Sequence, residues 1–298
     1  MSSRDQLTKR VLPQLVLSDQ SNPLTAAQPR DTILSPKGRA LNRFAVHGNA
    51  IVTGGAGGLG LEVARGLLEH GASCICLFDV LPSFASAQSA IAALGLEFPS
   101  CTIISEVVDV TDEEAVEKAV KRTVETLGSI DILLCFAGIV GCAHAEEMKA
   151  EEWRKVMDVN VNGTWFCAQA VGKQMIAQGT PGSIVLTASV SGHIVNFPQP
   201  QVAYNASKAA VLHLKNSLAA EWARYGIRVN SISPGYMDTI LNKGDGLDEA
   251  KKIWYSRIPM GRMGDPTELV GVVVLLCSAA GRYMTGTDIV VDGGMCVF

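Results

Sequence analysis

Thr53-Gly54-Gly55-Ala56-Gly57-Gly58-Leu59-Gly60 is the stretch of sequence that decides the fold. It follows a short apolar run, 50–53, and opens a segment of helical period over 59–70. Glycine lets the backbone turn sharply, and a helix N-terminus offers N–H groups and a positive dipole end to an anion. This order predicts a dinucleotide-binding turn that holds a pyrophosphate, with an ordinary flexible loop as the alternative. The residues expected to bind the cofactor are Gly54, Gly58, Leu59 and Gly60.

The same alternation of strand and helix continues to the end of the chain. The expected strands are 50–53, 73–78, 102–108, 130–136, 183–187, 227–231 and 288–291, and the expected helices are 59–70, 82–94, 112–127, 150–178, 203–225 and 266–278. Apolar strands that are separated by helices predict a parallel sheet covered on both faces. We therefore expect one α/β domain over residues 45–298, a doubly wound Rossmann-type fold of about seven strands.

Composition excludes several classes of protein. A net charge of −4 over 298 residues gives no basic surface for nucleic acid, and no apolar run approaches the roughly 18 residues of a membrane span. The eight cysteines include no CxxC pair, and the five histidines do not combine with them into a zinc site. These features predict a cytoplasmic protein in a reducing compartment, without a metal.

Residues 1–44 form an N-terminal extension that is polar, rich in proline and without a sustained period. We expect this extension to be flexible or extended, or to be an arm that covers a neighbouring subunit. Its basic residues suggest a transit peptide, but Asp5, Asp19 and Asp31 argue against one.

Two carboxylates follow expected strands on the cofactor side. Asp79 lies about 20 residues beyond the glycine turn, where a carboxylate accepts the ribose hydroxyls and repels a 2′-phosphate. No Arg or Lys occurs over 80–85, so NAD is predicted as the cofactor in preference to NADP. Capping of the next helix is the alternative for Asp79. Asp109, followed by Val110, is placed to meet the adenine or to cap the helix after it.

Tyr204-Asn205-Ala206-Ser207-Lys208 places a phenol and an ammonium on one helix face, with β-carbons about 5–6 Å apart. A nearby cation favours the phenolate, and lowering the phenol pKa by roughly 3 units needs about 4 kcal/mol. A partly desolvated Lys208 and a positively charged cofactor ring could supply this together. By itself the pair is also typical of an amphipathic helix with a packed Tyr and a solvated Lys.

Together, the glycine turn and the Tyr204–Lys208 pair resemble the short-chain dehydrogenase/reductase family, in its TGxxxGxG and YxxxK form, over residues 49–298. Further stretches match in order: Asn160-Val161-Asn162-Gly163, Ser189 within 188–192, Ser233-Pro234-Gly235 and Val291-Asp292-Gly293-Gly294.

The resemblance implies a role for each matching residue. Tyr204 is the general acid or base, Lys208 lowers its pKa and holds the nicotinamide ribose, and Ser189 donates a hydrogen bond to the reacting oxygen. Asn160 holds a water that links Lys208 to solvent. Capping of a strand end by Ser189, and a bridge from helix to sheet by Asn160, are the alternatives. The resemblance also implies cofactor contacts from Pro234, Gly235 and Thr239.

The chain departs from the family after the fourth expected strand. Where the family commonly has Asn-Asn-Ala-Gly, this sequence has Cys135-Phe136-Ala137-Gly138. Ala137 and Gly138, which let the cofactor ribose approach, are kept. The lost amides put in doubt the usual polar ties between this turn and the sheet.

Two loops indicate the substrate. The loops 191–200 and 234–241 look like those of the fungal sugar-alcohol branch: mannitol 2-dehydrogenases, sorbose reductases, arabinitol 2-dehydrogenases and xylulose reductases. A polyol needs several donors and acceptors, which His193, Asn196, Gln199 and Tyr236 could provide. A polar surface turn is the alternative. Asp79 points within this branch toward the NAD-linked arabinitol or xylulose type.

The last segments suggest a lid and an assembly. We expect residues of about 236–264 to form a lid that closes over the substrate. Their central stretch, 242–257, is polar and contains glycine. An inert connecting helix is the alternative for this stretch. The apolar end, 289–298, resembles the segment through which family members form tetramers, so a homotetramer is expected.

The sequence therefore predicts an NAD(H)-dependent oxidoreductase that interconverts a sugar alcohol and its ketose. A dehydrogenase or reductase for another secondary alcohol or a natural-product ketone is the second hypothesis. A catalytically silent NAD-binding regulator is the third, and the intact Ser189, Tyr204 and Lys208 argue against it.

Overall fold

The computed structural model describes residues 11–242 and 244–298. In this part of the chain, parallel strands form a 7-stranded sheet in the order β3-β2-β1-β4-β5-β6-β7. The predicted doubly wound α/β fold is thus confirmed. The strands are β1 (Asn49–Thr53), β2 (Cys74–Asp79), β3 (Thr102–Val107), β4 (Ile132–Cys135), β5 (Gly182–Thr187), β6 (Ile227–Pro234) and β7 (Asp288–Val291).

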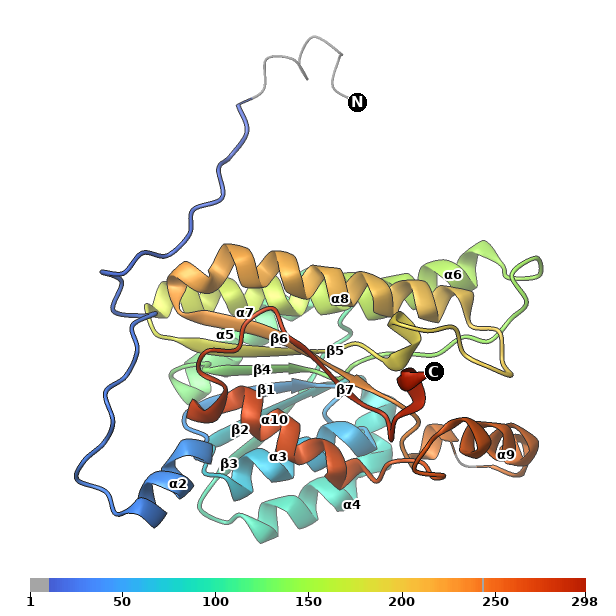
Figure 1. Ribbon diagram of the computed structural model, residues 1–298, viewed down its shortest axis with the longest axis horizontal. Coiled ribbons are helices and arrows are strands. Elements are labelled where there is room, and N and C mark those ends of the chain that lie inside the picture. Colours follow the sequence, from blue (N-terminus) through green and yellow to red (C-terminus); the bar gives the residue numbers. More distant parts are fainter. Residues whose placement is uncertain (1–10, 243) are drawn as a thin grey trace.

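Helices cover both faces of the sheet (Figure 1). On one face lie α5 (Glu113–Leu127), α7 (Thr164–Gln178) and α8 (Val202–Trp222), and on the other α3 (Gly58–Glu69), α4 (Leu81–Glu97) and α10 (Val270–Cys277). Every residue of β1 and β4 is buried, because these central strands have helices on both sides. Two apolar cores result, one on each face.

The strand order reverses between β1 and β4, which are neighbours although β2 and β3 intervene in the chain. A parallel sheet leaves a crevice at the carboxyl ends of its strands where the order reverses. The glycine turn follows β1 at this edge, and the helix α9 (Asp248–Arg257) lies beyond the same edge, close to the C-terminus (Figure 1). The fold therefore brings the predicted cofactor turn and the predicted lid to one end of the sheet.

The expected helix over 150–178 is interrupted. It consists of α6 (Ala150–Met157), a π-helical turn over Asp158–Gly163, and α7. Gly163 packs so closely on Val110 that an added β-carbon would lie 2.6 Å from Val110 Cγ2. A π-helical turn adds a residue to the helix and often marks a functional site. Here it contains Asn160, which is fully buried.

The prediction of an extended chain over 1–44 is wrong for its last part, because α2 (Pro36–Phe44) is a helix. Ser35 Oγ accepts a hydrogen bond of 3.0 Å from the N–H of Gly38, and Pro36 begins the helix, so a start signal was present in the sequence. Before α2 the chain runs along its own domain, where Asn22 Nδ2 donates to the carbonyl of Arg224 at 2.7 Å. Residues 1–10 of the extension lie outside the described residues.

The close contact between α3 and α10 can be tested by replacing a single glycine with alanine, which adds one methyl group. A β-carbon added at Gly66 would lie 2.3 Å from Val270 Cγ1, whereas one added at Gly95 in α4 would meet nothing within 4 Å. Replacing helical Gly by Ala stabilises by about 0.5–1 kcal/mol where space allows, but overpacking costs about 1–3 kcal/mol. We predict that Gly66→Ala lowers the free energy of unfolding and that Gly95→Ala raises it, as measured by chemical denaturation. An equal gain for both variants would show that α3 and α10 are not in close contact.

Candidate active site

Tyr204 and Lys208 lie in the first turns of α8, on the side that faces the sheet. Lys208 is 5% exposed, and its Nζ donates a hydrogen bond of 2.7 Å to the carbonyl of Thr187, the last residue of β5. The same Nζ lies 5.5 Å from the centroid of the Tyr204 ring. The spacing in the sequence thus places phenol and ammonium on one face, at the carboxyl edge of the sheet.

Burial governs the acid–base properties of this pair. Burial raises the pKa of Tyr204. A hydrogen bond with Ser189 lowers this pKa in part, and Tyr236 raises it further. Burial lowers the pKa of Lys208 to about 8, although an electrostatic contribution from Cys135 raises it. In the protein without its cofactor, desolvation raises the pKa of the phenol, and the expected lowering by Lys208 together with a positively charged cofactor ring stays a prediction. Tyr204 is a protonated donor at neutral pH unless a further positive charge is present.

Ser189 is buried directly after β5, where it begins a 3-10 turn over Val190–Gly192. Its Oγ accepts from the N–H of Ser191 at 3.2 Å and donates to Ser191 Oγ at 3.1 Å. The backbone cap considered for this residue is thus present. Ser189 also hydrogen-bonds Tyr204, so its hydroxyl serves the cap and the site together.

Asn160 connects the loop after β4 to α8. Its Oδ1 accepts from the N–H of Ile139 at 2.9 Å, and its Nδ2 donates to the Ile139 carbonyl at 2.9 Å and to Ser207 Oγ at 3.0 Å. Its own carbonyl accepts from Thr164 Oγ1 at 2.8 Å. This geometry gives Asn160 the bridging role, and its role in holding a water for Lys208 stays a prediction.

The glycine turn after β1 has the shape that a pyrophosphate needs. A β-carbon at Gly54 would lie 2.6 Å from the Ala137 nitrogen, and one at Gly60 would lie 2.2 Å from the Gly54 carbonyl oxygen, so only glycine lets the turn close. At Gly58 an added β-carbon would meet nothing within 4 Å, which leaves the outer side open. Within the described chain α3 begins without a side-chain cap and without an acidic residue in its first turn. Gly54, Gly58, Leu59 and Gly60 therefore fit a dinucleotide.

The two carboxylates beyond the turn serve the local backbone. Asp79 Oδ2 accepts from the N–H of Ala56 at 3.0 Å, and its Oδ1 accepts from the N–H of Val80 at 2.8 Å. Asp109 Oδ1 accepts from the N–H of Thr111 at 2.9 Å and from its hydroxyl at 2.7 Å. Asp79 ties the second strand to the glycine turn, and Asp109 stabilises the loop that begins with the buried Val110.

The turn after β4 keeps polar ties to the sheet despite the departure from the family pattern. The Ala137 N–H donates to Thr53 Oγ1 at 3.2 Å, and the Phe136 N–H donates to the Thr53 carbonyl at 3.0 Å. Cys135 is buried, and burial holds the pKa of its thiol well above the ordinary value, so the thiol stays neutral. A β-carbon at Gly138 would lie 3.7 Å from Lys208 Nζ, which shows how close this turn comes to the ammonium.

A cavity of about 290 Å³ opens at the Tyr204–Ser189 pair. Predicted residues that line it are Leu59, Ser189, Asn196, Gln199, Tyr204, Pro234, Gly235, Tyr236 and Thr239. Others were not foreseen, namely Val140, Cys142, Thr187, Gln201, Met237, Asn242, Leu247, Ala250 and Trp254. Two buried side-chain atoms of this wall, Thr187 Oγ1 and Asn196 Oδ1, have no hydrogen-bond partner within the described residues. A buried polar atom left unpaired in a cavity wall marks a place where a ligand group can bind.

His193 is the predicted substrate residue that the structure places elsewhere. It does not line the cavity. Its Nε2 lies 3.0 Å from Asp288 Oδ2 and 3.1 Å from Ser233 Oγ, on the side of β6 and β7. The 3-10 turn that follows Ser189 points this ring toward the edge strand. The structure thus places His193 outside the cavity wall, against Asp288 and Ser233, and its assignment to the substrate stays a prediction.

Trp254 is the most informative residue that sequence reasoning missed. It is 3% exposed and comes from α9, the helix of the predicted lid. Its ring stacks on Tyr236 with centroids 4.2 Å apart and planes 11° apart. The signal in the sequence was the short apolar run Ile253-Trp254-Tyr255 within a charged segment, because a Trp on such a helix buries a large apolar area when the helix packs.

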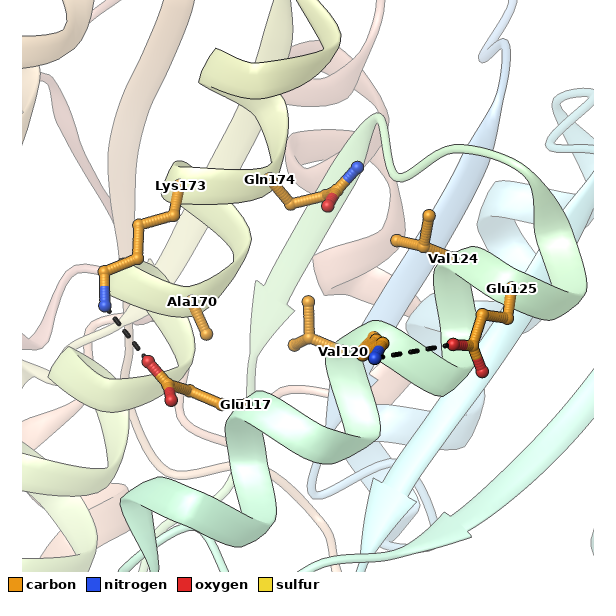
Figure 2. Close-up of a pocket in the computed structure, with 8 residues that line it drawn as sticks. Glu117, Val120, Val124, Glu125, Ala170, Lys173 and Gln174 are labelled. Carbon is orange, nitrogen blue, oxygen red and sulfur yellow. Dashed lines mark hydrogen bonds and ion pairs between the residues drawn. The ribbon is translucent and has the colours of Figure 1, made fainter.

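A second hollow lies between α5 and α7, away from the carboxyl ends of the strands. Figure 2 shows its wall, with Glu117 of α5 pointing toward Lys173 of α7 and an oxygen–nitrogen distance of 3.0 Å. Val120, Val124 and Ala170 form its apolar part. The pair is exposed, so it is a surface ion pair and not a chemical site. The described residues also hold no cluster of His, Cys, Asp or Glu that could bind a metal.

These features define a dehydrogenase-type site, in which a half-buried phenol and a buried serine face a cavity beside a turn that fits a dinucleotide. A family model described as enoyl-(acyl carrier protein) reductase matches residues 54–296. A probable NADP-dependent mannitol dehydrogenase of Yarrowia lipolytica is 40% identical over 259 residues, which cover 86% of this chain and 90% of that protein. A ribulose-forming D-arabinitol 2-dehydrogenase of Candida tropicalis is 42% identical, over 82% of this chain and 90% of that protein.

A solved short-chain type dehydrogenase/reductase from Mycobacterium marinum superposes with a TM-score of 0.80 at 40% identity, over 86% of this chain and 98% of that one. The chain belongs to the short-chain dehydrogenase/reductase family, and it is an oxidoreductase that acts on CH–OH groups. The resemblance seen in the motifs is thereby confirmed. Within the part of the chain that the structure describes, no helix is both long and apolar enough to cross a membrane.

The prediction of NAD as the preferred cofactor is wrong. The Yarrowia relative and others of similar identity are named as NADP-dependent mannitol dehydrogenases. Each carboxylate oxygen of Asp79 accepts one backbone N–H, from Ala56 and from Val80, so this residue has a structural role in the glycine turn. A carboxylate at this position can serve the turn, so its presence alone does not indicate NAD.

The burial of Lys208 predicts a gain in stability on its removal. At pH 7 the ammonium is charged in the folded and the unfolded state, and the change in pKa from 10.5 to about 8 corresponds to a cost on the order of 3 kcal/mol. Loss of the hydrogen bond to Thr187 offsets about 1 kcal/mol. We expect Lys208→Met to raise the free energy of unfolding by about 1–2 kcal/mol at pH 7.

This gain depends on pH with a defined sign. Between about pH 8 and 10.5 the folded wild-type protein has lost the Lys208 proton while the unfolded chain keeps it, so wild-type stability rises and the advantage of Lys208→Met shrinks. Denaturation curves at pH 7 and pH 9.5 measure this difference. Lys173→Met, at an exposed ion pair, is the control and should show no such gain. An advantage of Lys208→Met that stays constant with pH would contradict the assignment.

Proposed function

We propose that this protein interconverts a sugar alcohol and its ketose with NADP(H). The observation that carries the proposal is the group of polar side chains in the cavity wall, where Asn196, Gln199 and Tyr236 lie among more numerous apolar residues beside the catalytic phenol. A substrate with hydroxyl groups on several carbons pairs with such a wall, whereas a plain secondary alcohol would leave these groups unpaired. The names of the mannitol, D-arabinitol and sorbose relatives support the same substrate class.

The residues divide the chemistry between them. Ser189 Oγ holds the reacting oxygen, and Tyr204 donates its proton to that oxygen in ketose reduction and takes it back in alcohol oxidation. The nicotinamide, when bound, supplies or accepts the hydride. Lys208 keeps a positive charge beside the phenol, fixed in place by the carbonyl of Thr187. Ala137 and Gly138 leave room for the ribose next to this ammonium.

The binding of NADP(H) has support in the structure as well as in the relatives. The helix α4, with 17 residues, begins at Leu81 directly after Asp79, without a side-chain cap and without an acidic residue in its first turn among the described residues. Such a helix start attracts a phosphate. The charge of Asp79 is partly balanced by its two backbone donors. Leu59, Asp109, Val110, Pro234, Gly235 and Thr239 complete the proposed cofactor residues.

A homotetramer is part of the proposal. Val290 at the outer strand β7 is 41% exposed, and Val297 and Phe298 at the C-terminus are 68% and 97% exposed. Apolar side chains of this size at a sheet edge favour burial against another copy of the chain.

The proposed reaction predicts a defined result for Tyr204→Phe. Initial rates are measured on pentitols, hexitols and their ketoses, each with NADP(H) and with NAD(H). We expect the wild-type protein to turn over a polyol–ketose pair with NADP(H), and Tyr204→Phe to lower kcat by at least about 10³-fold while NADPH binding, followed by fluorescence, is retained. Turnover of simple ketones alone would favour the second candidate, a general ketone reductase. Retained turnover in Tyr204→Phe would overturn the mechanism.

The proposed coenzyme predicts the effect of Asp79→Asn. Removal of the negative charge near the expected 2′-phosphate should lower KM for NADPH about 3- to 10-fold and should leave KM for NADH equal or higher. Asp19→Asn, which removes a carboxylate that accepts the N–H of Ser21 at 2.8 Å in the N-terminal segment, is the matched control and should leave both KM values unchanged. An increase of KM for NADPH in Asp79→Asn would show that the carboxylate is needed for the shape of the turn rather than opposed to the phosphate.

A further inference from the structure

We infer that Trp254, Gln199, Tyr236 and Asn196 form one directional chain of hydrogen bonds, which presents a donor and an acceptor to a substrate hydroxyl beside the reacting carbon. The chain starts on the lid helix α9 and ends in the cavity wall. It makes Trp254 a positioning residue for substrate recognition, and this inference rests on the polyol–ketose reaction proposed above.

Trp254 sets the direction of these hydrogen bonds, because an indole N–H can only donate. Its Nε1 lies 3.0 Å from Gln199 Oε1, which therefore accepts. This bond orients the Gln199 amide, so that its Nε2 must point the other way. That nitrogen donates to the Tyr236 hydroxyl at 2.7 Å.

The Tyr236 oxygen is saturated as an acceptor. Asn196 Nδ2 donates to it at 3.2 Å, in addition to the bond from Gln199 Nε2 at 2.7 Å. A phenol oxygen has two lone pairs and one proton, and both lone pairs are now engaged. The proton of Tyr236 is left to donate, and Tyr236 borders the cavity close enough to Tyr204 to affect its pKa.

Asn196 provides the complementary group. Because its Nδ2 is committed to Tyr236, its Oδ1 is the free end of the amide. This oxygen is buried without a hydrogen-bond partner among the described residues, in a side chain that is 7% exposed and lines the cavity. A hydroxyl group both donates and accepts, so it satisfies Asn196 Oδ1 and Tyr236 Oη together.

The lid is coupled to this subsite by three contacts, which come from two residues of one helix. Trp254 stacks on Tyr236 and bonds Gln199, and Arg257 lies over the ring of Phe197 at 5.3 Å from its centroid. Gln199 and Phe197 belong to the same loop as Asn196. Movement of α9 away from the sheet would release the Gln199 amide, and the fixed donor direction of Tyr236 would then be lost. Closure of the lid and recognition of the hydroxyl are thus one event.

The experiment compares the ketose that the wild-type protein reduces fastest with its 1-deoxy and 3-deoxy analogues, each of which lacks one hydroxyl beside the reacting carbon. We expect the wild-type protein to reduce one of these analogues with a kcat/KM at least about tenfold lower than the ketose. Asn196→Leu should remove most of this preference, through loss of activity on the ketose and not on that analogue.

Trp254→Phe tests the start of the chain, since it keeps an aromatic ring against Tyr236 and removes only the indole N–H. We expect KM for the ketose to rise about 3- to 10-fold, with kcat on the deoxy analogue and KM for NADPH unchanged. Trp153→Phe, in the exposed α6, is the matched control and should change none of these. Thermal unfolding of each variant separates a loss of fold from a loss of recognition.

Two results would overturn the inference and can be told apart. If the wild-type protein reduces the ketose but Asn196→Leu and Trp254→Phe lower the rates on ketose and analogues equally, the hydrogen-bond chain does not read the neighbouring hydroxyl, and the proposed function stands. If the wild-type protein reduces no ketose in the panel, the proposed function fails and the subsite assignment fails with it.

Discussion

The buried ammonium of Lys208 is the constraint on which the site depends. A charge that is 5% exposed is tolerated only with close partners, and here the partner is the carbonyl of Thr187 at 2.7 Å. That carbonyl is available because Thr187 ends β5, where the ladder of backbone hydrogen bonds stops. The ammonium therefore ties α8 to the carboxyl edge of the sheet, and Tyr204, one turn earlier on α8, is held at that edge.

The surroundings of this charge explain three features that otherwise look unrelated. Gly138 packs closely on this site, because a β-carbon there would lie 3.3 Å from Asn160 Oδ1, a tight contact, and 3.7 Å from Lys208 Nζ. The π-helical turn brings Asn160 into the buried space where it can bind both Ile139 and Ser207. Cys135 stays a neutral thiol, because burial raises its pKa. The helix irregularity, the glycine and the small buried side chain thus make room for one cation.

The sequence allowed the sheet, the glycine turn and the Tyr204–Ser189–Lys208 group to be predicted, because each depends on local pattern. Apolar runs of strand length that alternate with helical periods leave few arrangements other than a covered parallel sheet. The π-helical turn in 150–178 has no such local signal, and its Gly163 packs closely on Val110, which is distant in the sequence. The orientation of His193 was likewise decided by tertiary contacts with Asp288 and Ser233. The helix α2 was predictable from Ser35-Pro36 and was missed because proline was taken only as a breaker.

The cofactor error and the missed Trp254 have a common cause. A side chain was assigned by its chemical type, without knowledge of which of its atoms the protein itself uses. Asp79 is a carboxylate at the position where an acidic residue can accept the ribose hydroxyls, but both its oxygens also accept backbone N–H groups.

The cavity residues also differ in which of their side-chain atoms are bonded within the protein. Gln199 uses its amide oxygen for Trp254 and its amide nitrogen for Tyr236, and these two bonds fix its orientation. Asn196 keeps its oxygen free. Catalytic and recognition groups therefore differ in how they are fixed: the former by the sheet edge through β5 and α8, the latter by a helix beyond that edge. Because the two supports are separate, we expect changes in α9 to alter which alcohol fits without disturbing Tyr204, the proposed proton donor.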